Sequence, residues 1–385
     1  MNTPPGGAAL AAFRLDDTEI VEAGDPGGML RQIASSAAQV RTTLRVCAEA
    51  DLSALSPDAR PRAIVVVGSG GAGGSGFACD ALAAVCGVGS PVQVTGVSGY
   101  QLPGWIGAAD LVVAVTRSGH TAEALALAGE AARRGCDLVG VGAPDSPLQE
   151  LVLRARGTFI PVTAAGPARA MPWALTVPLL VAATRLGAAR IEDDAYEAAA
   201  AVMEDVSHQC RPSSESFVNP AKSLALDLAG LLPMIWGSSP LAGVAAARFA
   251  AQLNEDAKYP AVHGTLPEVN HNQVVAFDGP FAPWPAAGPV NYAEEQPRPA
   301  VPLRLVILAD SQEHPQVTRR RAASAELAAQ RGIEVTELAA EGERPLERLA
   351  SLVQLTDYAA VYLGIASGLD PGPVAVIGDL KDRIA

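Results

Sequence analysis

The chain has 385 residues, of which 49% are hydrophobic and 18% charged, and its formal net charge is −13. At about 150 residues per domain, this length predicts two or three domains with a large core. The high hydrophobic and low charged content excludes a disordered protein. The acidic balance argues against nucleic-acid binding, because phosphate backbones select an excess of Lys and Arg. Gly, Pro or Arg interrupts the apolar runs well before about 18 residues, so we expect no membrane partner.

The five cysteines are scattered and show no CxxC spacing: Cys47, Cys79, Cys86, Cys136 and Cys210. An odd, scattered set predicts small buried side chains rather than a disulfide framework or a zinc site. A reducing compartment, the cytoplasm, fits this usage best. Only three of the 28 basic residues are lysines, namely Lys222, Lys258 and Lys381, so these three positions merit attention.

The first half of the chain shows a helical pattern and then an alternation of strands and helices. Residues 1–60 have apolar residues at helical spacing and predict a helical lead-in. The expected strands are 63–68, 91–97, 110–116, 137–143 and 157–162, and the expected helices are 76–86, 121–135 and 148–155. This alternation predicts a doubly wound, mainly parallel sheet.

The second half repeats the alternation after a helical stretch at about 170–206. The expected strands are 231–238, 272–277, 303–309 and 333–338, and the expected helices are 241–257, 316–331 and 345–364. We therefore divide the chain into a lead-in (1–60), a first α/β domain (61–209), a polar linker (210–228), a second α/β domain (229–370) and a C-terminal tail helix (371–385).

A glycine-rich loop, GSGGAGGSG (68–76), joins the first expected strand to a helix. Gly73, Gly74 and Ser75 would let the backbone approach an anion at the helix start. The loop alone is equally compatible with a tight turn or a dinucleotide site. A nicotinamide site is disfavoured because the second strand ends in TGVSGY, without an acid for a ribose.

A second loop, TRSGHT (116–121), follows another strand and opens a helix. Thr116, Ser118 and Thr121 place three hydroxyls within six residues, and hydroxyls with free amides can bind phosphate oxygens. The alternative is that Thr121 merely caps the helix. Both loops follow parallel strands, so they are expected to converge on one crevice, where open α/β sheets bind ligands.

These loops, together with four further segments, resemble the sugar isomerase (SIS) superfamily. The segments are PARAM (167–171), LNEDAK (253–258), LPEVNHNQ (266–273) and PVAVIGDLK (373–381). Over roughly residues 60–385 the chain is most similar to the bifunctional phosphoglucose/phosphomannose isomerases. The resemblance implies an α/β fold of two flavodoxin-like SIS subdomains and a hexose 6-phosphate substrate, with no cofactor and no metal.

Two residues are candidates for the proton transfer itself. Glu255 is a carboxylate near the end of a long expected helix, and the matching glutamate in the family moves the proton between C1 and C2. Arg169 could stabilise a developing enediolate, because a guanidinium stays charged and offers a fixed fork of donors. Taken alone, each could equally be an ordinary surface charge.

Two further residues are candidates for opening the sugar ring. His271 can shuttle a proton near neutral pH, although an isolated histidine is often structural. In the family the corresponding histidine reaches over from a partner subunit, which implies a homodimer. Lys381 would act with His271, and the apolar residues around it suggest that the tail docks.

The chain departs from the family pattern at three positions. Thr116 stands where Ser is usual, which keeps the hydroxyl, while His120 replaces a common Asn and Gln273 a common Glu. The tail turn reads DPGPV, without the threonine that many members have. Activity on mannose 6-phosphate is therefore a weaker expectation than activity on glucose 6-phosphate.

The sequence thus predicts a cytoplasmic aldose–ketose isomerase that interconverts glucose 6-phosphate, and mannose 6-phosphate, with fructose 6-phosphate. Three alternatives remain open: a non-catalytic sugar-phosphate sensor, a nicotinamide-dependent oxidoreductase, and an isomerase of another sugar phosphate. A sensor would need only the two loops, whereas an isomerase also needs Glu255, His271 and Lys381.

Overall fold

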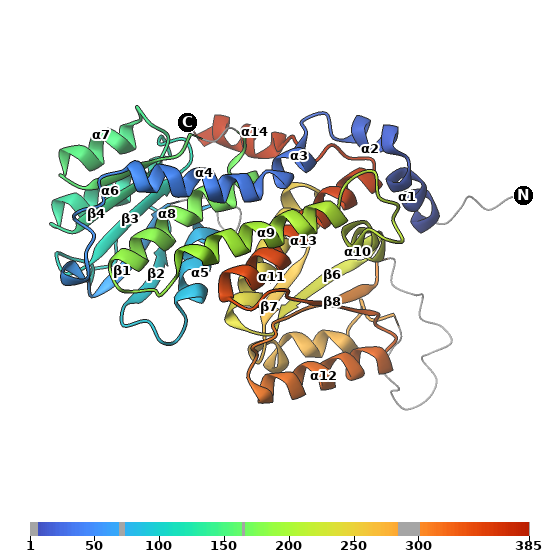
Figure 1. The fold of residues 1–385 in the computed structure, drawn as a ribbon. Helices are drawn as coiled ribbons and strands as arrows, with labels where there is room; N and C mark the ends of the chain where they lie inside the picture. Colours follow the sequence, from blue (N-terminus) through green and yellow to red (C-terminus); the bar gives the residue numbers. More distant parts are fainter. Residues whose placement is uncertain (1–6, 69–73, 164–165, 284–300, 385) are drawn as a thin grey trace, which may run out of the picture. The chain divides into compact units, whose positions relative to one another are not determined.

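The computed structural model describes residues 7–68, 74–163, 166–283 and 301–384, which fall into two compact units (Figure 1). Unit 1 contains Met1–Ile33, Glu204–Glu341 and Arg348–Ala385, and unit 2 contains Ala34–Met203 and Gly342–Glu347. These units group residues by packing, whereas the predicted domains follow the chain. The domain division therefore stays a prediction.

Unit 2 is built on a parallel sheet with the strand order β2-β1-β3-β4-β5. Its strands are β1 (Ala63–Gly68), β2 (Gln93–Val97), β3 (Leu111–Thr116), β4 (Asp137–Gly142) and β5 (Thr158–Pro161). Every residue of β1 and β3 is buried, as expected of central parallel strands covered on both faces. This is the flavodoxin-like order, so the predicted fold class is confirmed.

Helices cover both faces of this sheet. They are α4 (Ser36–Glu49), α5 (Ser75–Cys86), α6 (Ala122–Arg133), α7 (Pro147–Arg154), α8 (Pro172–Arg185) and α9 (Asp193–Gln209), with the short helices η1 (Pro57–Ala59) and η3 (Ala168–Ala170). Helices α5 and α8 pack together on one face, and α6 and α7 cover the other (Figure 1). The stretch predicted as helical at about 170–206 forms two helices, because Gly187 turns the chain with φ +68°.

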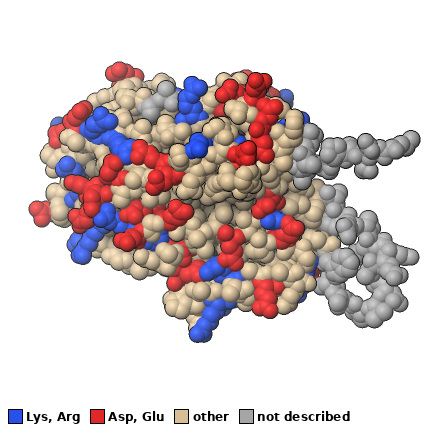
Figure 2. Space-filling model, turned by 45° about the vertical axis from the view of Figure 1, so that its right-hand side comes forward, with Lys and Arg blue, Asp and Glu red and all other residues tan. Residues whose placement is uncertain are grey.

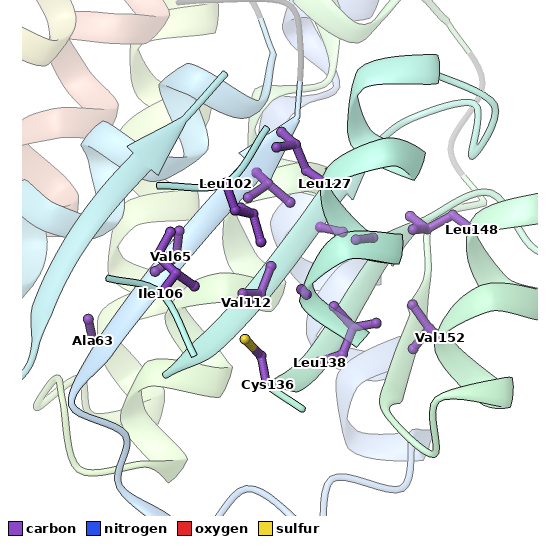
Figure 3. Close-up of a cluster of buried hydrophobic side chains, with 14 residues drawn as sticks. Ala63, Val65, Leu102, Ile106, Val112, Leu127, Cys136, Leu138, Leu148 and Val152 are labelled. Carbon is purple, nitrogen blue, oxygen red and sulfur yellow. The ribbon is translucent and has the colours of Figure 1, made fainter. Parts of the chain in front are cut away.

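On the face covered by α6 and α7, alternate residues of the strands pack against the two helices and form a hydrophobic core. Val65, Val112 and Leu138 point from the sheet toward Leu127 of α6 and Val152 of α7 (Figure 3). All five are at most 4% exposed, and burying such side chains stabilises a fold by about 1.5–3 kcal/mol each. The sheet is thereby held rigid below the turns that follow its strands.

Unit 1 contains a smaller parallel sheet with the order β7-β6-β8-β9. Its strands are β6 (Leu232–Gly237), β7 (Val262–Thr265), β8 (Leu303–Ala309) and β9 (Val335–Ala339). The predicted strands at 231–238, 303–309 and 333–338 are therefore confirmed. Helix α12 covers one face of this sheet and α11 the other (Figure 1).

The strand predicted at 272–277 is wrong. This segment forms the short helix η5 (Gln273–Asp278), in which Phe277 stacks on Trp236 at 5.5 Å while Val275 stays 67% exposed. An apolar run this short fits a strand or one buried turn equally well. The strand that pairs with β6 is instead β7, whose residues are half-buried or exposed and carry no apolar signal.

The helices of unit 1 include one inside the predicted linker 210–228. They are α1 (Gly7–Asp16), α2 (Thr18–Gly24), α3 (Met29–Ala34), α10 (Pro220–Leu228), α11 (Pro240–Glu255), α12 (Pro315–Gln330), α13 (Pro345–Ala366) and α14 (Ala375–Ile384), with η4 (Glu268–His271). Helix α10 is capped by Asn219, whose side chain accepts hydrogen bonds from Ala221 and Lys222. The polar segment thus ends at an N-cap rather than continuing as a linker.

Two helices differ from what the sequence predicts: one forms a long apolar segment, and the tail helix does not dock. Helix α13 is long and apolar enough to cross a membrane, but 94% of its most apolar 18-residue window is buried inside the structure. It is therefore a core helix of this fold. Helix α14 was expected to dock, yet none of its side chains is buried.

Gly237 ends β6 where the first turn of α11 packs directly onto the strand. A Cβ atom there would collide with the backbone of Ala242 and Gly243, which cannot move without displacing the helix. We predict that Gly237→Ala lowers the free energy of unfolding by about 1–3 kcal/mol in urea titrations. Gly378→Ala is the matched control, because nothing lies within 4 Å of that position, and an equal loss in both variants would contradict the prediction.

Candidate functional site

The crevice of unit 2 lies between the carboxyl ends of β1 and β3. These strands are neighbours at the centre of the sheet, paired in the register Gly68↔Val115, and the chain leaves them toward opposite faces. The turns after two such strands begin at the same edge of the sheet. Ser75 at the start of α5 and the loop 116–121 after β3 therefore stand at this edge.

Ser75 lies in the gap between the two strand ends. It is the first residue of α5, it is 6% exposed, and Gly74 precedes it as the N-cap. A Cβ atom on Gly68 would meet the Ser75 hydroxyl at 2.6 Å and collide with the Val115 carbonyl. Only glycine at 68 therefore leaves room for this hydroxyl, while Gly73 lies outside the described residues.

Thr116 and Thr121 face each other across the second loop. Their hydroxyl oxygens lie 2.6 Å apart, with Thr116 at the end of β3 and Thr121 at the N-cap of α6. The Thr121 side chain makes no capping hydrogen bond, so the simple capping alternative does not describe it. The paired hydroxyls can turn as donors toward an anion that enters the crevice.

Ser118 and His120 form the tip of this loop. The Ser118 hydroxyl accepts a hydrogen bond from the His120 amide at 3.2 Å, and the His120 ring Nδ1 donates to the Ser118 carbonyl at 2.7 Å. Gly119 between them has φ +72°, and a Cβ there would collide with Ser146. Gly119 is not among the predicted site residues, although it stands inside the TRSGHT loop.

A cavity of about 380 Å³ opens beside Ser75, on the β2 side of β1. Burial raises the pKa of the Asp80 carboxyl there, and it raises the pKa of the Cys79 thiol to about 12. A thiol with that pKa is not a nucleophile near neutral pH. Ser98, Tyr100 and Glu123 also line the cavity.

Arg169 follows β5, the edge strand, and therefore stands two strands away from β3. It lies in the short helix η3 and is only 5% exposed. The Gln39 side-chain amide donates a 2.8 Å hydrogen bond to the carbonyl of Ala170, the next residue. Gln39 of α4 thus fixes the turn that carries Arg169. The two bonded residues are 131 positions apart, so a local sequence pattern does not predict this contact.

The other three predicted residues belong to unit 1 and stand on separate elements. Glu255 is the last residue of α11 and is half-buried. His271 ends η4 and is exposed, and Lys381 is exposed on α14.

Two residues not predicted as site residues hold these elements in place. Lys258 donates hydrogen bonds to the carbonyls of Glu255 at 2.8 Å, Asp370 at 3.1 Å and Pro371 at 3.3 Å. Its ammonium thereby joins the end of α11 to the segment that leads into α14. Gln273 accepts a hydrogen bond from the Trp236 indole and donates to the His263 carbonyl, which anchors the turn after His271.

Among the described residues, no group of three or more His, Cys, Asp or Glu side chains could hold a metal ion. Acidic and basic side chains are interspersed on the face that Figure 2 shows. The described groups that could bind an oxyanion at the crevice are the hydroxyls of Ser75, Thr116, Ser118 and Thr121 and the amides at the start of α5.

Comparisons with known proteins show that the chain resembles SIS proteins. Residues 217–384 match the family model of the bacterial phosphoglucose isomerase C-terminal SIS domain. Among solved structures, the chain is similar to a hypothetical protein from Thermus thermophilus (TM-score 0.64, 18% identity, 98% of this chain and 94% of that one). It is also similar to a glucose-6-phosphate isomerase-like protein from the same organism (TM-score 0.57, 19% identity, 94% and 99%).

The curated relatives that the chain resembles share one name. A bifunctional phosphoglucose/phosphomannose isomerase of Caldicellulosiruptor bescii is 28% identical over 287 residues, which cover 74% of this chain and 79% of that protein. A protein of the same name from Thermoplasma acidophilum is 24% identical over 324 residues, covering 84% and 89%. These matches confirm the predicted resemblance of the chain to the bifunctional phosphoglucose/phosphomannose isomerases.

The paired hydroxyls generate a prediction about anion binding. We expect Thr121→Val to weaken the binding of inorganic phosphate about fivefold or more, because one hydrogen-bond donor to the anion is lost. Thr121→Ser keeps the hydroxyl and should bind like the unmodified protein in calorimetric titrations. Equal affinities for the Val and Ser variants would contradict this role for the hydroxyl.

The Lys258 contacts generate a prediction about the tail. Lys258→Met keeps the aliphatic stem but removes the ammonium, so amide exchange over residues 369–374 should accelerate about fivefold or more. Lys381→Met makes the same chemical change on α14 and serves as the control. Unchanged exchange in Lys258→Met would show that the ammonium does not hold this segment.

Proposed function

We propose that the protein is an aldose–ketose isomerase that interconverts glucose 6-phosphate, and mannose 6-phosphate, with fructose 6-phosphate. The observation that carries this proposal is the crevice of paired hydroxyls at the switch point of a flavodoxin-like sheet. The relatives named for phosphoglucose and phosphomannose isomerisation support the substrate. We further propose that the protein acts in the cytoplasm, as a homodimer, without a metal or cofactor.

The phosphate of the sugar would bind in the crevice of unit 2. The hydroxyls of Ser75, Thr116, Ser118 and Thr121 would donate to its oxygens, and Gly74, which has no side chain, would leave room for its close approach. The helix start at Ser75 adds amide donors, each oriented by the fold before the ligand arrives. Binding through neutral donors fits a protein whose net charge is −13.

Ring opening would use His271 and Lys381. One group protonates the ring oxygen while the other takes the proton from the C1 hydroxyl, so the net charge of the sugar is unchanged. Both side chains are exposed on unit 1, where a ligand can reach them. In the proposed dimer, His271 serves the site of the partner subunit, as the family resemblance implies.

Proton transfer would use Glu255 as the base. The carboxylate removes the proton from C2 of the open-chain aldose and an enediolate forms with its charge on O1. The proton of the C2 hydroxyl passes to O1, and the same carboxyl group returns its proton to C1 to give the ketose. Arg169 stabilises the negative oxygen of the enediolate, because a buried guanidinium keeps its charge and a fixed set of donors. The half-buried position of Glu255 keeps its carboxyl partly shielded from water.

The variant Glu255→Gln tests this assignment. It should lower kcat at least about 100-fold while the KM changes little, because general base catalysis is lost and the shape is kept. The measurement is a coupled assay of fructose 6-phosphate formation from glucose 6-phosphate and, separately, from mannose 6-phosphate. Glu268→Gln, an exposed glutamate on η4, is the matched control.

Two outcomes would count against different parts of the proposal. Retention of more than about a tenth of the activity by Glu255→Gln would remove this residue from the base role. Absence of fructose 6-phosphate formation by the unmodified protein, from either aldose phosphate, would overturn the proposed function itself.

A further inference from the structure

The sheet of unit 1 contains a second crevice built to the same plan as the first. Strand β6 is central and pairs with β8 in the register Gly237↔Leu308, just as β1 pairs with β3 in the register Gly68↔Val115. A serine at or near the first turn of a helix follows each central strand: Ser75 in unit 2 and Ser239 in unit 1. The residues after β8 therefore correspond to the hydroxyl loop after β3.

The crevice between β6 and β8 is occupied by a side chain of the protein itself. The Asp310 carboxylate accepts hydrogen bonds from the Ser239 hydroxyl at 2.7 Å, from the Arg348 Nε at 2.7 Å and from the Gln312 amide at 3.2 Å. Its own amide donates to the Ser238 hydroxyl at 2.8 Å. These donors, which an oxyanion would use there, are already engaged.

Burial and charge make this arrangement a built site rather than a surface contact. Ser238 is 1% exposed, Arg348 3%, Asp310 6% and Ser239 8%. A buried charge is tolerated when it is paired and hydrogen-bonded, and the Asp310–Arg348 pair meets that condition. In the first crevice, by contrast, the corresponding loop presents the hydroxyls of Thr116, Ser118 and Thr121.

We infer that the β6–β8 crevice is an oxyanion site permanently filled by the Asp310 carboxylate, which stands where a phosphate would bind and closes this crevice to sugar phosphates. This inference concerns unit 1 alone and holds whether or not the crevice of unit 2 binds phosphate.

Removal of the carboxylate tests the inference by chemical rescue. Asp310→Ala leaves Ser239 and Arg348 around a space that formate, a free carboxylate, can fill. We expect about 0.2 M sodium formate to raise the Tm of Asp310→Ala by about 3 °C or more beyond the effect of equal sodium chloride. The unmodified protein should show no such formate-specific rise.

Three controls separate site occupancy from general effects. Asp310→Asn keeps the space filled, and Asp310→Ala combined with Ser239→Ala removes a donor, so neither should respond to formate. Asp194→Ala breaks an Asp–Arg pair at the surface, where the Asp194 side chain is 68% exposed and that of Arg344 41%, so it should not respond either. A formate response that is absent from Asp310→Ala, or equal in Asp194→Ala, overturns the inference.

Refolding covers the case in which Asp310→Ala does not fold in chloride. Recovery of its far-ultraviolet circular dichroism in formate, and not in chloride, supports the inference. Failure to recover in formate, while Asp310→Asn folds, contradicts it.

Discussion

The structure depends on one constraint: the turns after two central parallel strands gather oriented donors at a single point, and those donors require a negative partner. Both sheets of this chain obey the constraint, with the same strand order around the point. In unit 2 the donors are hydroxyls that face a crevice, and in unit 1 they are satisfied by the chain's own carboxylate, balanced by Arg348. One architecture thus accommodates the open anion site that we propose in unit 2 and the filled one that we infer in unit 1.

The sequence predicts those elements whose burial is complete. The runs at 63–68 and 303–309 coincide with β1 and β8, because central parallel strands are apolar on both faces. The sequence does not predict elements that are only partly buried. Strand β7 has no apolar pattern, and the apolar run at 272–277 forms a short helix that buries Phe277 rather than a strand. Tertiary pairing with β6 decided both outcomes, and no local pattern contains that information.

The site is predictable where its chemistry is local. The hydroxyl loop can be recognised within six residues, whereas Gln39, Lys258 and Arg348 act on partners 38 to 131 residues away. The scarcity of lysine is a partial exception, because it drew attention to Lys258 from the sequence alone. Lys222 and Lys258 each donate to several backbone carbonyls, a task that suits a compact ammonium better than a planar guanidinium. The sequence singled these lysines out, but only the fold supplies the reason.

A crystal structure of the unmodified protein with fructose 6-phosphate tests the central claim most directly, because it locates the phosphate group itself. Our account predicts phosphate density in the crevice between β1 and β3, within hydrogen-bonding distance of the hydroxyls of Thr116, Ser118 and Thr121. It also predicts that the Asp310 carboxylate still fills the crevice between β6 and β8. Phosphate bound in the second crevice, or bound away from the three hydroxyls, would contradict the account.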